Sequence, residues 1–102
     1  MSEQVKLLLS WNIKPNQEAT TFEFMAQEMA PAVQRMGITP TEAWYTVYGD
    51  QPQILVGAIS DDIETLNEIL EGEEWGKLME RLADLVEDFH HKIVQAGSRF
   101  QF

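Results

Sequence analysis

The chain has 102 residues, of which 17 are acidic and only seven are Lys or Arg, so its formal net charge is −10. Hydrophobic residues make up 44% of the chain, which is enough for a folded domain with a small core. A chain with this charge repels phosphate, so we expect neither nucleic acid nor anionic membrane surfaces as partners. There is no Cys, which excludes disulfides, thiolate metal ligands and a Cys nucleophile.

The first residues, Met1–Gln4, lack the basic and apolar segments of a signal peptide. No apolar run approaches the length of about 20 residues that a membrane-spanning helix requires. We therefore expect one domain over residues 1–102, located in the cytoplasm and without membrane contact.

The first predicted element is a strand at Val5–Ile13, where side chains alternate between an apolar side and a mixed side. Over Gln17–Met36 the apolar spacing changes to three and four residues, which predicts a helix. Pro31 lies inside this helix, and a proline removes an amide donor and clashes with the preceding turn. We therefore expect a kink or a break near Glu28, and an end of the helix at Gly37 in a left-handed conformation.

Two segments rich in aromatic and β-branched residues, Glu42–Tyr48 and Gln53–Ile59, predict a β-hairpin. The intervening residues, Gly49–Pro52, have the composition of a turn. Because two isolated strands are not stable in water, the rest of the chain must supply more sheet and a cover of helices.

The second half of the chain predicts two further helices and a last strand. Asp61 and Glu64 have the spacing of a capping box, which predicts a short helix that ends at Gly72. Apolar residues then recur every three or four positions over Glu73–Gln95, which predicts a long helix. The alternation in Ser98–Phe102 predicts a final short strand.

The order strand, helix, strand therefore occurs twice. This is the βαββαβ pattern of a ferredoxin-like α+β fold, here with the second helical layer split into two helices. We expect a four-stranded antiparallel sheet in the order 4-1-3-2, with the helices on one face. The strand residues expected to pack on the helices are Val5, Leu7, Leu9, Trp11, Ala43, Tyr45, Val47, Ile54, Val56, Ala58, Phe100 and Phe102.

The other face of the predicted sheet has no remaining segment to cover it. An open apolar patch beside an uncharged edge strand is an aggregation hazard, so we expect a second copy of the chain to cover this face. The predicted partner is thus the chain itself, in a homodimer with its two sheets face to face. The residues predicted at this interface are Leu8, Ser10, Trp44, Thr46, Tyr48, Leu55 and Ile59.

This pattern resembles the dimeric α+β barrel superfamily. The resemblance rests on the order of elements, on Trp44–Asp50, on the passage Leu70–Trp75 into a long helix, and on the terminal Phe100–Phe102. The superfamily contains antibiotic-biosynthesis-type and haem-degrading monooxygenases, small isomerases, dye-decolourising peroxidases, stress-responsive proteins and many members without known activity. The resemblance implies dimerisation and a small member of the antibiotic-biosynthesis-monooxygenase-like or uncharacterised type, but no particular activity.

The haem-degrading branch can be tested on the sequence. Its members use an Asn on the first strand together with a Trp and a His in the later helical segment. Asn12 matches the Asn, but the Trp position falls on Ile69 and the His position on Met79. Since two of the three residues are missing, we expect no haem and no other cofactor.

The histidines, His90 and His91, are adjacent on the predicted long helix. Neighbouring helical residues point about 100° apart, so the pair cannot bind one metal ion, and Glu87 with His91 would be two exposed ligands only. We therefore expect no metal site. Trp75 and the methionines at positions 25, 29, 36 and 79 are interpreted as core or gap-filling residues rather than as part of a cofactor site.

The mixed face of the sheet offers a candidate ligand site. In the predicted strand order, Asn12, Tyr48 and Arg99 lie at the same end of the sheet, with Trp44 one step inward. An aromatic floor with an amide and a guanidinium can hold a small aromatic or carboxylate ligand. The alternative is that these residues only fill the dimer interface.

Two hypotheses about function follow. In the first, the protein is a small dimeric barrel whose sheet face serves assembly and the binding of a small molecule. In the second, it is a cofactor-independent monooxygenase or isomerase that acts on a small aromatic or quinone substrate. A cavity of several hundred Å³ lined by Asn12, Tyr48, Arg99 or His90 would favour the second hypothesis, and a filled sheet-to-sheet interface without a cavity would favour the first.

Overall fold

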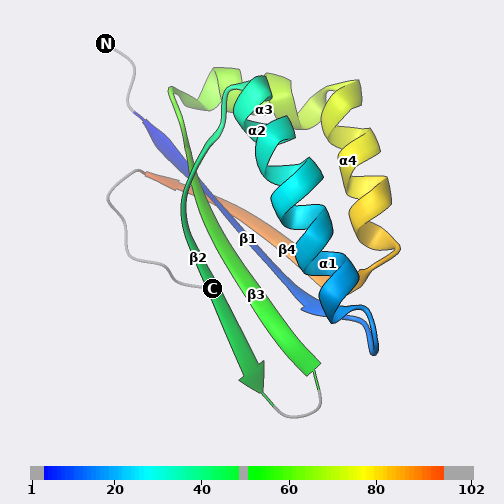
Figure 1. The fold of residues 1–102 in the computed structure, drawn as a ribbon. Coiled ribbons are helices and arrows are strands. Elements are labelled where there is room, and N and C mark those ends of the chain that lie inside the picture. Colours follow the sequence, from blue (N-terminus) through cyan, green and yellow to red (C-terminus); the bar gives the residue numbers. More distant parts are fainter. Residues whose placement is uncertain (1–3, 49–50, 96–102) are drawn as a thin grey trace.

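The computed structural model describes residues 4–48 and 51–95 (Figure 1). A first strand and a first helical layer are followed by two strands, two helices and a last strand, and one segment of the first helical layer is a π-helix. The elements are β1 (Val5–Ile13), α1 (Glu18–Phe24), the π-helical segment η1 (Met25–Met29), α2 (Ala30–Met36), β2 (Thr39–Tyr48), β3 (Gln51–Ser60), α3 (Ile63–Glu71), α4 (Glu73–Ala83) and β4 (Val86–Gln95).

The strands form one antiparallel sheet in the order β2-β3-β1-β4. This is the predicted order, read from the opposite edge. The predicted hairpin is confirmed by the pairing of β2 with β3, in which Tyr48 lies opposite Gln51. The helices cover one face of the sheet, with α2 beside α4 (Figure 1). The fold is thus the ferredoxin-like α+β fold expected from the sequence.

The regular α-helical hydrogen bonding of the first helical layer is interrupted just before Pro31, as predicted, while the backbone stays helical from Glu18 to Met36. The regular helix α1 ends at Phe24, η1 forms the next turn, and α2 begins at Ala30 with Pro31 in its first turn. Pro31 has no amide N–H to close a regular helical hydrogen bond, and the wider π turn directly precedes it. Gly37 ends the layer with φ 106°, a left-handed conformation that suits glycine.

The prediction of a long helix over Glu73–Gln95 was wrong in its second half. The helix α4 ends at Ala83, and the next ten-residue element, Val86–Gln95, is the fourth strand, β4. The register between β1 and β4 shifts between Ser10 and Asn12, and Asp88 has φ 55°, so β4 carries a β-bulge. The predicted strand Ser98–Phe102 lies outside the described residues.

The bulge explains why this strand looks helical in sequence. One extra residue enters the strand at the bulge, so the apolar residues Val86 and Phe89 are separated by three positions, while Phe89 and Ile93 keep a regular spacing of four. These spacings are also those of an apolar helix stripe. Phe89 nevertheless packs on the sheet, since its ring stacks on Trp11 of β1 with centroids 6.1 Å apart.

Other predicted boundaries also move. The strand β3 begins at Gln51 rather than Gln53, so Gln51 and Pro52 belong to the strand and not to the predicted turn. The cap of α3 is Asp62 rather than Asp61, because the Asp62 carboxylate accepts a 2.7 Å hydrogen bond from the amide of Thr65. The strand β2 begins at Thr39 rather than Glu42, and a second bulge interrupts its pairing between Pro40 and Glu42.

The core lies between the sheet and the helices. Strand residues from the predicted apolar side contribute to it, and the helices contribute at least as many buried residues, among them Phe24, Leu66, Trp75, Leu78 and Leu82. One part of that prediction was wrong, because β2 extends beyond the helices (Figure 1). Its residues Ala43, Tyr45 and Val47 are exposed, the last two at 51% and 66%.

Candidate functional site: an apolar cavity between the helices and the sheet

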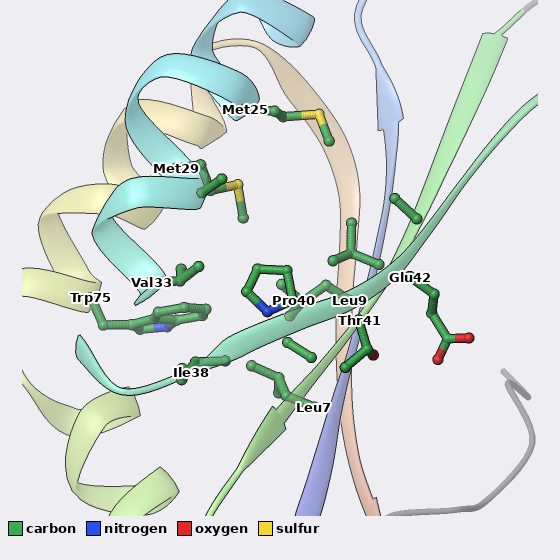
Figure 2. Close-up of a pocket in the computed structure, with 14 residues that line it drawn as sticks. Leu7, Leu9, Met25, Met29, Val33, Ile38, Pro40, Thr41, Glu42 and Trp75 are labelled. Atoms are coloured by element: carbon green, nitrogen blue, oxygen red, sulfur yellow. The ribbon is translucent and has the colours of Figure 1, made fainter. Parts of the chain in front are cut away.

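A cavity of about 330 Å³ lies between the first helical layer and the face of the sheet that the helices cover (Figure 2). Side chains from β1, η1, α2 and α4 surround it, and the start of β2 closes one side. The apolar residues that define its walls are Leu7, Leu9, Met25, Met29, Val33 and Trp75.

The π turn places two flexible side chains in this wall. Met25 and Met29 are the first and last residues of η1, and both line the cavity. Methionine is unbranched and adapts its shape to irregular spaces. Trp75 from α4 lies at the opposite end of the cavity from Met25 (Figure 2) and is buried.

The polar residues on the cavity wall come from the bulge in β2. The hydroxyl of Thr41 donates a 3.2 Å hydrogen bond to the carbonyl oxygen of Gly57. The side chain of Glu42 points away from Met25, Met29 and Trp75 (Figure 2). Among the described lining residues, therefore, no charged side chain is directed into the cavity.

Glu42 instead belongs to the far face of the sheet, the face that the helices leave open. Its carboxylate forms an ion pair with the ammonium group of Lys6 on β1. The pair passes over Gly57 of β3, where a Cβ atom would lie 2.7 Å from Oε1 of Glu42. Only glycine leaves room for this arrangement without a shift of Glu42.

The residues of the predicted ligand site are not brought together by the described structure. Asn12 lies opposite Gln53 and Trp44 lies opposite Leu55, so β3 separates the two. The side-chain amide of Asn12 donates a 3.1 Å hydrogen bond to the carboxylate of Asp88. The side chain of Tyr48 and all of Arg99 lie outside the described part, so the four-residue site stays a prediction.

The cavity itself was missed at the level of sequence. Met25, Met29 and Trp75 were interpreted as core residues, and this is confirmed for Met29 and Trp75, which belong to the core, while Met25 packs against it. The available signal was the break at Pro31, because π turns are frequent at functional sites. Neither a break nor a methionine, however, reveals from sequence whether the space beside it is filled.

The histidines lie on β4 rather than on a helix, so the predicted helical geometry was wrong. His90 lies opposite Ser10, His91 lies opposite Leu9, and both are exposed. Within residues 4–48 and 51–95, no group of three or more His, Asp or Glu side chains is arranged to hold a metal ion. In the same part of the chain, no helix has the length and apolar character needed to cross a membrane.

The predicted dimer interface is partly buried within a single copy. Leu8 and Ser10 are buried, and Leu55 and Ile59 are half-buried. On the edge strand β2, Thr46 is exposed and Trp44 has 58% of its surface exposed. The side chain of Tyr48 is outside the described part.

Comparison with known proteins places the fold. No family model and no curated protein matches the chain. Among solved structures, a variant of SnoaB, a cofactor-independent oxygenase from Streptomyces nogalater, is similar with a TM-score of 0.71 and 13% identity, over 96% of this chain and 97% of SnoaB. A NIPSNAP family protein from Agrobacterium tumefaciens gives 0.68 and 16%, over 99% and 91% of the two chains. A protein of unknown function from Nitrosomonas europaea gives 0.66 and 21%, over 97% and 94%.

The chain has the ferredoxin-like α+β fold of these proteins. This agrees with the resemblance to dimeric α+β barrels that the sequence suggested. At such low identities the likeness concerns the fold alone, and an activity does not follow from a fold.

Proposed function

We propose that the protein binds a small, uncharged aromatic molecule in the cavity between η1, α2 and the sheet. The observation that carries this proposal is a space of about 330 Å³ with almost entirely apolar walls in a chain of this size. Ligand pockets typically have volumes of about 300–1,000 Å³ and mainly hydrophobic walls with a few polar groups. The volume here therefore suits a small molecule.

The charges of the described residues favour a neutral ligand over a carboxylate. Burying an ionised carboxylate without a partner has a high cost in free energy. Lys6, the base on the neighbouring strand, is paired with Glu42 on the far face of the sheet. Of the two ligand classes expected from the sequence, aromatic and carboxylate, the cavity thus supports the aromatic one.

The side chains at the two ends of the cavity suit a flat ring. Thioether sulfur atoms, such as those of Met25 and Met29, make favourable contacts with aromatic rings. An indole ring, such as that of Trp75, can stack on a flat ligand or meet its edge. The hydroxyl of Thr41 donates its hydrogen to the carbonyl oxygen of Gly57, so its oxygen can accept a hydrogen bond from a ligand hydroxyl.

Binding can be tested with a neutral and a charged ligand of the same shape. We expect 2-naphthol to raise the melting temperature of the protein with saturable dependence, and 2-naphthoate to do so much less. The variant Ala30→Phe places a ring in the cavity wall and should abolish the effect of 2-naphthol. The matched control is Ala26→Phe, at an exposed position of η1, which should bind like the unmodified protein. Unchanged 2-naphthol binding by Ala30→Phe would contradict the proposal.

A second candidate function is cofactor-independent oxidation of the bound aromatic molecule. The likeness in fold to SnoaB and the apolar cavity support it. An activated methylene group can react with O₂ to give a carbonyl group and water, and the substrate then supplies all four electrons without a cofactor. Oxygen uptake and diketone absorbance with 2-tetralone, a two-ring ketone with an activated methylene group, test this, with Ala30→Phe and a protein-free sample as controls. A rate equal to that of the protein-free sample would leave binding as the function.

We also infer that two copies pair through the far faces of their sheets. Trp44 is a large exposed aromatic residue on that face, Leu55 and Ile59 are half-buried there, and the charges of Lys6 and Glu42 neutralise each other. The expected interface buries about 1,200–2,000 Å² or more. Sedimentation at micromolar concentration should give twice the mass of the chain, and a monomer under these conditions would reject the pairing.

A further inference from the structure

We propose that Phe22 and Tyr45 form the end wall of the cavity and limit the length of the molecule that it accepts. This inference rests on the proposed function, because it concerns which ligands the same cavity selects. The two side chains do not line the cavity itself. They lie just beyond it, where the first helical layer and the edge strand β2 approach one another.

The contact between the two rings closes the gap between α1 and β2. Phe22 and Tyr45 meet edge to face, with ring centroids 5.0 Å apart and an interplanar angle of 86°. This geometry is the favourable one for two aromatic rings, because the positive edge of one meets the negative face of the other. The contact bridges elements that are far apart in sequence.

The periodicity of both elements places this pair next to the Met25 end of the cavity. Phe22 precedes Met25 by three residues, so the two share one side of the helical layer. Tyr45 follows Ala43 by two residues, so the two share one face of β2. Met25 and Ala43 both line the cavity, and Met25 is at the end away from Trp75 (Figure 2).

The exposure of the rings shows that they lie at the surface rather than in the core, as a wall between the cavity and solvent requires. Phe22 is 38% exposed and Tyr45 is 51% exposed. The next residue on the same face of β2, Val47, is 66% exposed. A ligand that extended past Met25 would therefore meet this ring pair first and water next.

Shortening either ring should change which ligands bind. In Phe22→Ala or Tyr45→Ala, the third ring of a long ligand can occupy the vacated space and replace the lost aromatic partner. Aromatic pairs of this kind correspond to a factor of about two to ten in an equilibrium constant. We therefore expect the affinity for a three-ring ligand, relative to that for a two-ring ligand, to rise by about this factor.

The test is calorimetric titration of the full chain with phenol, 2-naphthol and 2-anthrol, which are neutral and differ only in the number of fused rings. The unmodified protein should bind 2-naphthol more tightly than 2-anthrol, and both alanine variants should shift toward 2-anthrol. The matched control is Ile63→Ala, which also shortens an exposed apolar residue, but on α3 and outside the cavity wall. It should leave the ratio of affinities unchanged.

The possible results separate this inference from the proposed function. If the unmodified protein binds the series but neither alanine variant changes the 2-anthrol to 2-naphthol ratio, the end wall is rejected and the ligand site stands. If the ratio changes equally in Ile63→Ala, the end wall is likewise rejected, since the effect is not local. If no member of the series binds any form of the protein, the ligand site is rejected and the inference with it.

Discussion

The two faces of the sheet differ in how a single copy of the chain covers them. The face under the helices is closed by apolar side chains from β1, η1, α2 and α4, and what remains is the cavity. The far face carries the partly buried pair of Lys6 on β1 and Glu42 on β2, and the exposed Trp44 on the edge strand β2. One face thus has the features of a small-molecule site, and the other has those of a contact with a larger partner.

The largest expected effect of a single substitution lies on the helix-covered face. Trp75 is buried and forms one end of the cavity. Trp75→Ala should therefore reduce the free energy of unfolding by about 3–5 kcal/mol, as large-to-small changes in cores do. Urea unfolding followed by circular dichroism measures this. Ile63→Ala, at an exposed apolar position, is the control and should lower the midpoint far less; an equal effect would mean that Trp75 contributes no more than a surface residue.

A substitution on the far face should act on assembly instead. Trp44→Glu places a carboxylate in the proposed interface between two copies, where it would be desolvated without a partner. We expect the dimer dissociation constant to rise by at least about 30-fold, which corresponds to about 2 kcal/mol. Sedimentation over a concentration series gives the constant, with Ile63→Glu as the control for added charge. If 2-naphthol binding weakened as much as dimerisation, the two faces would not be independent.

Substitution of two glycines should change the stability of the protein in opposite directions. Gly57→Ala forces the new methyl group against Glu42, 2.7 Å from Oε1 and 2.9 Å from Cγ, and should cost about 1–2 kcal/mol of stability. Gly76 lies in α4 with no neighbouring atom within 4 Å of the added group. Gly76→Ala should therefore gain about 0.5–1 kcal/mol through higher helix propensity.

Thermal unfolding of the two glycine variants measures both changes in stability. The double variant Gly57→Ala with Glu42→Ala should recover part of the lost stability, because the clash with the carboxylate is gone. A stabilising Gly57→Ala would show that the position of Glu42 over β3 adds nothing to the fold.

The sequence predicted the fold wherever one periodicity ran without interruption. The alternation of Val5–Ile13 is unbroken and gave β1 with its bounds. The β2 and β3 hairpin and the break before Pro31 followed from residue types with strong local preferences. The same reasoning failed in β4, because the bulge at Asp88 converts a spacing of two into three, and together with the regular spacing of four between Phe89 and Ile93 this resembles a helix.

The candidate site was harder to predict than the fold. Which face each residue of β1 and β3 occupies follows from alternation, so the far face was assigned correctly for Leu8, Ser10 and Leu55. Whether a space between apolar side chains is filled depends on their volumes and on how closely the layers approach. Met25, Met29 and Trp75 have the same pattern in sequence whether they close a core or surround a cavity.

The smallest expected effects on stability concern two ion pairs, one on the far face of the sheet and one between the helices. Lys6 and Glu42 pair with side chains that are only 12% and 32% exposed, whereas Arg35 and Glu74 pair between α2 and α4 at 65% and 50%. Exposed pairs are screened by water and contribute under about 1 kcal/mol, and many contribute nothing measurable.

We therefore expect Lys6→Met to cost about 1 kcal/mol of stability, because it leaves the partly buried Glu42 without its partner, and Arg35→Met to cost less. The loss in Arg35→Met should also vanish in 1 M salt, while most of the loss in Lys6→Met should persist, since salt screens exposed charges most strongly. Equal losses that salt abolished alike would mean that the far face is as open to solvent at Lys6 as the helix surface is at Arg35, and the contrast between the two faces would then rest on the cavity alone.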